Sequence, residues 1–138
     1  MNTDARTDLQ QIVRAKGLRA TPSRLAVLEL LRTSAVPMSH GDVADRLSAS
    51  SWDRATIYRN LTDLAEVGLV RRTDMGDHIW RFEAVSGDHE HPHFVCIECG
   101  TVECLPEIEL SIRRAKAPRA IKQRKVEVHV RGRCDTCL

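Results

Sequence analysis

Two Cys-x-x-Cys pairs constrain this chain more than any other feature of its sequence. The pairs are Cys96–Cys99 and Cys134–Cys137, with 34 residues between them. Each turn can bring two sulfurs to one ion, and together they supply the four thiolates that suit tetrahedral Zn²⁺. Gly100 and Gly132 adjoin the pairs and favour tight turns there. A redox dithiol or buried cysteines are alternatives, but neither needs two matched pairs, so we expect a structural zinc without an open position for substrate.

Length and charge leave the class of protein open. The chain has 138 residues and a net charge of +2, enough for one or two small domains whose cores a structural metal would support. Locally, residues 11–28 carry four basic side chains and no acid. No apolar run reaches membrane-spanning length, and no signal-peptide pattern opens the chain. Five cysteines without an export signal indicate metal ligands rather than disulfides, and we expect a cytoplasmic protein without membrane contact.

The first half has the pattern of four short helices followed by a hairpin. Gly17 ends a first helix over residues 8–16, and Thr21-Pro22 opens a second. Two further helices, over residues 39–48 and 53–67, have helix-turn-helix proportions. Strands over residues 69–72 and 78–82 then flank a turn. The pattern predicts a winged-helix DNA-binding domain over residues 1–83, within an α+β fold.

The fourth helix carries the features of a helix that reads DNA. Ile57, Leu61 and Leu64 share one side, which predicts a buried face. Tyr58 and Arg59 point the other way, and Arg54 lies near the positive end of the helix. These side chains can contact bases or phosphates, although an ordinary solvated face is the alternative.

The second half predicts a small α/β domain that depends on its zinc site. A polar hinge over residues 84–90 separates it from the first, so we place a dimerisation and metal-binding domain over residues 91–138. The expected elements are strands over residues 93–96, 101–104 and 125–131, and a helix over residues 106–116. Its core is small, which favours pairing with a second copy.

A second group of metal-ligand residue types lies around the hinge. His91 and His93 fall on one face of an extended strand, while Glu83 and Cys104 lie nearby in sequence. Two imidazoles, a carboxylate and a thiolate favour Zn²⁺ or Fe²⁺ over Mn²⁺ or Mg²⁺. We expect this regulatory site to take ligands from both domains and to set the angle between them. Cys104 can instead be a buried cysteine, His40 is expected at the surface, and His78 and His129 are weaker candidates.

At these residues the chain resembles the ferric uptake regulator family of bacterial metal-dependent repressors. The resemblance extends from Gly17 to Cys137, and it includes the motifs Ala-Thr-Ile-Tyr-Arg-Asn-Leu at 55–61, Trp-Arg-Phe-Glu at 80–83 and His-x-His at 91–93. It implies a homodimer, a structural Cys₄ zinc, and a hinge metal that closes the dimer onto palindromic operator DNA. Together with the helix pattern, it places the DNA contacts at Lys16, Arg19, Arg54, Thr56, Tyr58 and Arg59.

Two departures from the family pattern affect the sensing site. Pro37 stands where the family often has a histidine, and Cys104 replaces the usual carboxylate. Pro92 and Val126 occupy ligand positions of an additional family site, which we therefore expect to be missing. The thiolate favours zinc, or an Fe²⁺ site that senses peroxide through oxidation of the cysteine.

The sequence therefore predicts a metal-responsive repressor and not an enzyme. A peroxide-sensing repressor of the same family is the first alternative. A zinc hydrolase using His91, His93 and Glu83 is the second, and a zinc-stabilised DNA-binding protein without sensing is the third.

Overall fold

The computed structural model describes residues 3–85, 92–105, 111, 116–123 and 126–138. The chain divides into two compact units, Met1–Ser86 and Gly87–Leu138. The described helices are too short and too polar to cross a membrane.

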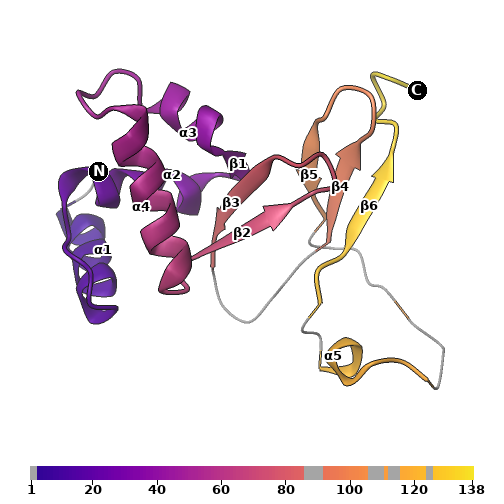
Figure 1. Cartoon of the computed structure of the whole chain (residues 1–138), viewed down its shortest axis with the longest axis horizontal. Coiled ribbons are helices and arrows are strands. Elements are labelled where there is room, and N and C mark those ends of the chain that lie inside the picture. Colours follow the sequence, from indigo (N-terminus) through magenta and orange to yellow (C-terminus); the bar gives the residue numbers. More distant parts are fainter. Residues whose placement is uncertain (1–2, 86–91, 106–110, 112–115, 124–125) are drawn as a thin grey trace. The chain divides into compact units, whose positions relative to one another are not determined.

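Four helices make up most of the described N-terminal unit, and three of them have side-chain caps (Figure 1). The hydroxyl of Thr21 accepts the Arg24 N–H at 3.3 Å, Ser39 and Asp42 form a reciprocal capping box, and Asp53 accepts the Thr56 N–H at 2.7 Å. These three caps start the helices where the sequence predicts them. The helices are α1 (Thr3–Ala15), α2 (Pro22–Thr33), α3 (His40–Arg46) and α4 (Arg54–Glu66).

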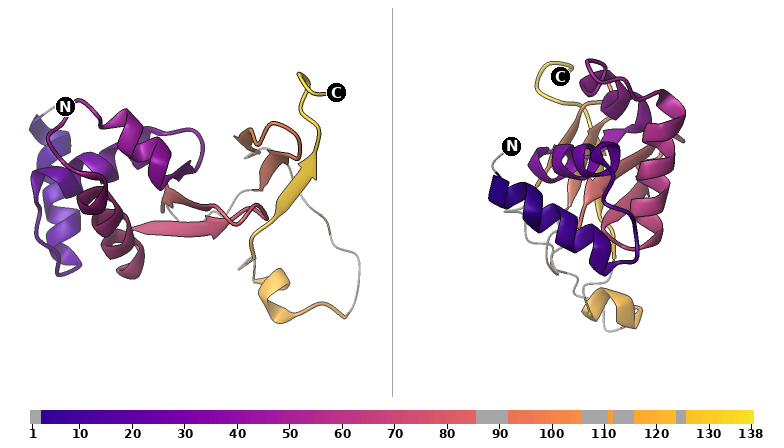
Figure 2. Two further views of the ribbon diagram at one scale, coloured as in Figure 1. Left: turned by 45° about the horizontal axis from the view of Figure 1, so that its top comes forward. Right: turned by 90° about the vertical axis from the view of Figure 1, so that its left-hand side faces the viewer.

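A three-stranded antiparallel sheet completes this unit. The short strand β1 (Met38–Ser39) pairs with β3 (Trp80–Ala84), which pairs with β2 (Val70–Asp74), so that Met38 lies opposite Phe82. Figure 2 shows α4 leading into β2 and the hairpin of β2 and β3 extending beyond the helices. Gly68, with φ +82°, makes the turn between α4 and β2, which favours glycine.

The core of the N-terminal unit lies where α2, α4 and β3 meet. As predicted, α4 buries Ile57, Leu61 and Leu64, and β3 adds Phe82, which is 1% exposed. Burying a side chain of this size contributes roughly 1.5–3 kcal/mol. The core therefore fixes which face of α4 remains outside. The buried hydrophobic residues of this core are Leu9, Val13, Leu25, Val27, Leu28, Leu31, Met38, Val43, Ala44, Ile57, Leu61, Leu64, Val70 and Phe82.

The C-terminal unit is built on a mixed sheet in the order β5-β4-β6 (Figure 1). Its strands are β4 (His93–Cys96), β5 (Val102–Cys104) and β6 (His129–Gly132), and a short helix, α5, spans Arg119–Lys122. β5 runs antiparallel to β4, whereas β6 runs parallel to it. The parallel pairing brings the end of the chain back beside β4.

The structure confirms the α+β class and corrects several element boundaries. α1 begins at Thr3 rather than residue 8, the last strand begins at His129 rather than residue 125, and β1 and α5 were not predicted. The helix expected over residues 106–116 lies almost entirely outside the described residues. Gly132 does not make a positive-φ turn; instead, a Cβ there would lie 3.4 Å from the Phe94 ring.

Candidate metal centres and nucleic-acid interface

The two Cys-x-x-Cys turns lie at neighbouring strand ends. Cys96 ends β4 opposite Gly132 of β6, and the Ile97 N–H donates to the Gly132 carbonyl at 2.8 Å. In the first turn the Gly100 N–H donates to the Cys96 carbonyl at 3.0 Å, and Gly100 has φ +76°. In the second turn the Cys137 N–H donates to the Cys134 carbonyl at 3.0 Å. The parallel β4–β6 pairing therefore brings together two pairs that are far apart in the sequence.

The spacing of the four sulfurs fits one tetrahedral ion. Their Sγ atoms all lie within 4.8 Å of one another, and those of Cys99 and Cys134 are 3.7 Å apart. Zn–S bonds of about 2.3 Å at the tetrahedral angle would place sulfurs about 3.8 Å apart. The cluster therefore suits a structural Zn²⁺. Because it takes sulfurs from both pairs, a redox dithiol is the poorer interpretation.

Hydrogen bonds to sulfur also fit a metal-binding thiolate. The N–H groups of Cys99 and Cys134 donate to Cys96 Sγ at 3.5 and 3.4 Å, and they lower the pKa of Cys96 to about 6. The Thr101 hydroxyl, 3.0 Å from Cys99 Sγ, lowers the pKa of Cys99. The neighbouring sulfurs, Cys134 foremost, raise the pKa of Cys137 to about 12. Zn²⁺ bound by four thiolates would displace the protons of the thiols.

Two predicted ligands of the second site are cross-strand partners in the C-terminal unit. His93 on β4 lies opposite Cys104 on β5, and a ring nitrogen of His93 lies within 4.8 Å of Cys104 Sγ. His93 is 5% exposed, and Cys104 is half-buried. An imidazole and a thiolate at this spacing fit a second, regulatory divalent metal.

The other two predicted ligands are not members of this strand pair. Glu83 belongs to β3 of the N-terminal unit, where the Arg71 guanidinium donates to its carboxylate at 3.4 Å. His91 lies outside the described residues. The parts of Glu83 and His91 in the second site therefore stay predictions.

The outer face of α4 presents the predicted DNA-contacting side chains. Tyr58 is 47% exposed and Arg59 is exposed, while Thr56 is half-buried beside the helix cap. Arg54 forms an exposed ion pair with Asp45 at 3.0 Å. Lys16 and Arg19 are exposed in the turn between α1 and α2, where the Arg19 carbonyl accepts a bond from Arg24. Whether these six residues contact DNA stays a prediction.

His40 is a residue of this surface whose role the sequence did not indicate. Its Nε2 lies 2.8 Å from the Arg54 carbonyl oxygen, and its ring meets the Tyr58 ring edge-on with centroids 5.3 Å apart. His40 thus joins the start of α3 to the first turn of α4. The only sequence signal for this role is the position of His40 directly after the cap residue Ser39. In a helix-turn-helix, the start of one helix can contact the start of the next.

The wing hairpin carries a second exposed aromatic side chain. The Arg72 guanidinium lies 4.4 Å from the centre of the Trp80 ring, and Trp80 is 49% exposed. At the tip of the hairpin, Asp74 accepts N–H groups of Gly76 and His78 at 2.8 and 3.1 Å. The wing therefore presents a cation stacked on an aromatic face.

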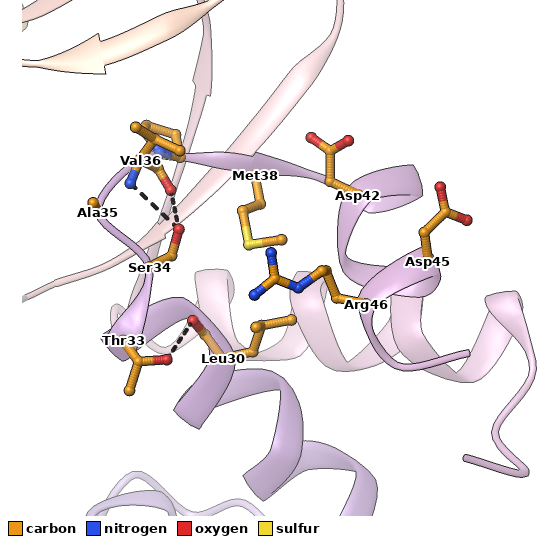
Figure 3. Close-up of a pocket in the computed structure, with 10 residues that line it drawn as sticks. Leu30, Thr33, Ser34, Ala35, Val36, Met38, Asp42, Asp45 and Arg46 are labelled. Carbon is orange, nitrogen blue, oxygen red and sulfur yellow. Dashed lines mark hydrogen bonds between the residues drawn. The ribbon is translucent and has the colours of Figure 1, made fainter. Parts of the chain in front are cut away.

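The α2–β1 turn and α3 line a hollow of about 530 Å³ (Figure 3). Figure 3 shows the Arg46 guanidinium beside Met38, with the carboxylates of Asp42 and Asp45 directed away from it. Asp42 belongs to the capping box and Asp45 pairs with Arg54. The hollow therefore gathers no set of metal ligands.

Together, the winged helix-turn-helix and the sulfur cluster are typical of a DNA-binding protein with a metal centre in its second domain. The chain belongs to the ferric uptake regulator family, whose sequence model matches residues 15–131. It is 30% identical over 131 residues to the ferric uptake regulation protein of Haemophilus ducreyi, with 90% of this chain and 87% of the relative covered.

Two further proteins show the range of this similarity. The peroxide operon regulator of Bacillus subtilis is 34% identical over 94 residues, which cover 67% of this chain and 63% of the relative. The crystal structure of the Vibrio cholerae ferric uptake regulator is similar in fold, with a TM-score of 0.69 and 24% identity over 91% of this chain and 98% of that chain. The family assignment confirms the resemblance found in the sequence, and the chain is a metal-binding transcriptional regulator of this family.

Proposed function

We propose that this regulator is a repressor that binds a palindromic operator as a homodimer and senses Zn²⁺ or Fe²⁺ at the second site. The cross-strand pair of His93 and Cys104 carries the proposal, because it supplies soft ligands separate from the four-sulfur cluster. Glu83 and His91 complete the ligand set, and Glu83 brings the winged-helix domain under control of the ion.

The proposed control requires the ion to prefer the form that binds DNA. A tenfold preference corresponds to about 1.4 kcal/mol per site, and two sites in a dimer would contribute about 2.8 kcal/mol. Tyr58, Arg59 and Arg54 would then meet successive major grooves about 34 Å apart. The six DNA-contacting residues predicted from the sequence fit this arrangement, since five are exposed and Thr56 is half-buried.

Operator affinity at controlled free metal concentrations tests the proposal. An operator would be selected from a random duplex pool with zinc-loaded protein, and its affinity measured against buffered Zn²⁺, Fe²⁺ and Mn²⁺. We expect zinc or iron to raise the affinity at least tenfold and manganese to act only at much higher concentration. Equal affinity with the second site emptied and the four-sulfur zinc retained would overturn the proposal.

Peroxide sensing is the second candidate function, favoured by Cys104 and by the similarity to the peroxide operon regulator of Bacillus subtilis. An iron-bound thiolate can be oxidised, which would remove a ligand and release the ion. In this case peroxide would abolish DNA binding by the iron-loaded protein under anaerobic conditions. The zinc-loaded protein would be affected much less.

A further inference from the structure

Three metal-ligand side chains form one row across the sheet of the C-terminal unit. Cys104 on β5 lies opposite His93 on β4, and His93 lies opposite His129 on β6. Residues opposite one another on neighbouring strands project from the same face of a sheet. Cys104, His93 and His129 therefore share one face, although they come from three separate segments of the sequence.

The rings of His93 and His129 are already in contact. Their centroids are 6.5 Å apart and their planes are inclined at 62°. Neighbouring strands are about 4.8 Å apart, so the backbones of Cys104 and His129 are about 9.5 Å apart across the row. An ion held above His93 could bridge this distance. The Cys104 thiolate would bind it from one side at about 2.3 Å, and the longer His129 imidazole would bind it from the other side at about 2.1 Å.

His129 has a buried ring nitrogen without a hydrogen-bond partner among the described residues. Its Nε2 is shielded from solvent, and the Glu127 carboxylate lies 3.8 Å away, beyond hydrogen-bonding distance. Leaving a buried polar atom unpaired costs free energy. A cation bound at Nε2 would satisfy the nitrogen and would also lie near the negative charge of Glu127.

We propose that His129 is a ligand of the second metal site, in a row with His93 and Cys104. This inference rests on the proposed function and deepens it, because it supplies the site with a ligand from a third strand of the C-terminal unit. One thiolate and two imidazoles suit Zn²⁺, Co²⁺ or Fe²⁺. This unit can then hold the ion by itself, and Glu83 adds a ligand when the winged-helix domain engages.

Cobalt binding to the full-length protein tests this assignment without reference to DNA. Zn²⁺ would first fill the four-sulfur cluster, and Co²⁺ would then be titrated into wild type, His129→Ala and His129→Gln. The visible d–d absorption reports the coordination of the cobalt, and the thiolate charge-transfer band reports bonding to Cys104. His78→Ala is the matched control, because the His78 side chain is 97% exposed on the wing.

We expect both His129 variants to bind Co²⁺ at least tenfold more weakly and with an altered d–d spectrum, while His78→Ala behaves as wild type.

Unchanged affinity and spectrum in the His129 variants would overturn the assignment. A loss of affinity with the wild-type spectrum would also overturn it, since that result indicates a residue that only supports a ligand. If wild type itself takes up no second cobalt, the proposed function and the role of His129 both fail, whereas a wild-type response in the His129 variants removes only His129. Retained zinc content and circular dichroism show that the variants are folded.

Discussion

His40 shows how a single side chain can position the predicted DNA-contacting surface. It contacts both the Arg54 carbonyl and the Tyr58 ring, so it fixes the start of α4 and one aromatic side chain on the exposed face. Neither contact follows from the periodicity of the sequence, because each depends on how tightly α3 and α4 approach. The sequence did predict the exposed face of α4, since burial of Ile57, Leu61 and Leu64 determines it.

We expect His40→Ala to weaken operator binding about three- to tenfold, because a hydrogen bond worth about 0.5–1.5 kcal/mol and the support of Tyr58 are lost. His40→Gln, which can still donate to the Arg54 carbonyl, should recover part of the affinity. Fluorescence anisotropy with labelled operator measures the affinity of both variants. In a double-mutant cycle, His40→Ala should cost much less in a Tyr58→Ala background. Strictly additive effects would contradict this role.

Asn60 is a buried polar residue on the core side of α4. Its side-chain amide donates to the Ser23 hydroxyl at 2.9 Å, which links α4 to α2. We expect Asn60→Ala to lower the free energy of unfolding of the N-terminal unit by about 0.5–1.5 kcal/mol, because the buried bond to Ser23 is lost and the Ser23 hydroxyl keeps only its 3.4 Å contact with the Thr21 hydroxyl. Urea unfolding should show a lower midpoint with an unchanged m-value. Glu66→Ala, on the exposed side of α4, is the control, and an equal effect there would argue against the explanation.

Elements with local signals were predictable, and elements defined by distant partners were not. Caps at Thr21, Ser39 and Asp53 mark helix starts because the capping bond forms within four residues. β1 has two residues and exists because Met38 pairs with Phe82, far along the chain. The cysteine pairs predicted a four-sulfur site, but the parallel β4–β6 pairing that assembles it and the neighbouring His93–His129 contact have no local signature.

We expect Cys137→Ser to abolish tight zinc binding at the four-sulfur cluster, because three thiolates and a hydroxyl no longer form a closed site for the ion. Zinc content after dialysis against a weak chelator should fall by one ion per chain relative to wild type. Cys104→Ser, which changes a cysteine outside the cluster, should retain that ion. The reverse result, with zinc lost in Cys104→Ser and kept in Cys137→Ser, would show that the two sites have been assigned wrongly.

At the scale of the whole molecule, DNA binding has to depend on the placement of charge rather than on its amount. The net charge is +2, so a general attraction to phosphate is weak. The operator sequence, the metal and the pairing of two copies could not be predicted from local patterns, because each depends on surfaces formed by several elements together.

We therefore expect Arg59→Ala to weaken operator binding measurably despite the small change in net charge. If Arg59 meets phosphate, the slope of log affinity against log salt should fall by about 0.9 per protomer. If it meets a base, the slope should stay the same and discrimination between operator variants should drop. Lys122→Ala, an exposed residue of α5, is the control. Wild-type affinity, slope and discrimination in Arg59→Ala would remove this residue from the interface.

The contact between Arg72 and Trp80 also gives the protein an intrinsic optical reporter. The chain has two tryptophans, Trp52 and Trp80, and both belong to the N-terminal unit. Trp80 lies half-exposed on the wing against a guanidinium, so its emission should respond when the wing meets another surface. The proposed metal ligands His93 and Cys104 lie in the other unit, which has no tryptophan. A change of fluorescence during a metal titration without DNA would therefore record communication between the domains in unlabelled protein.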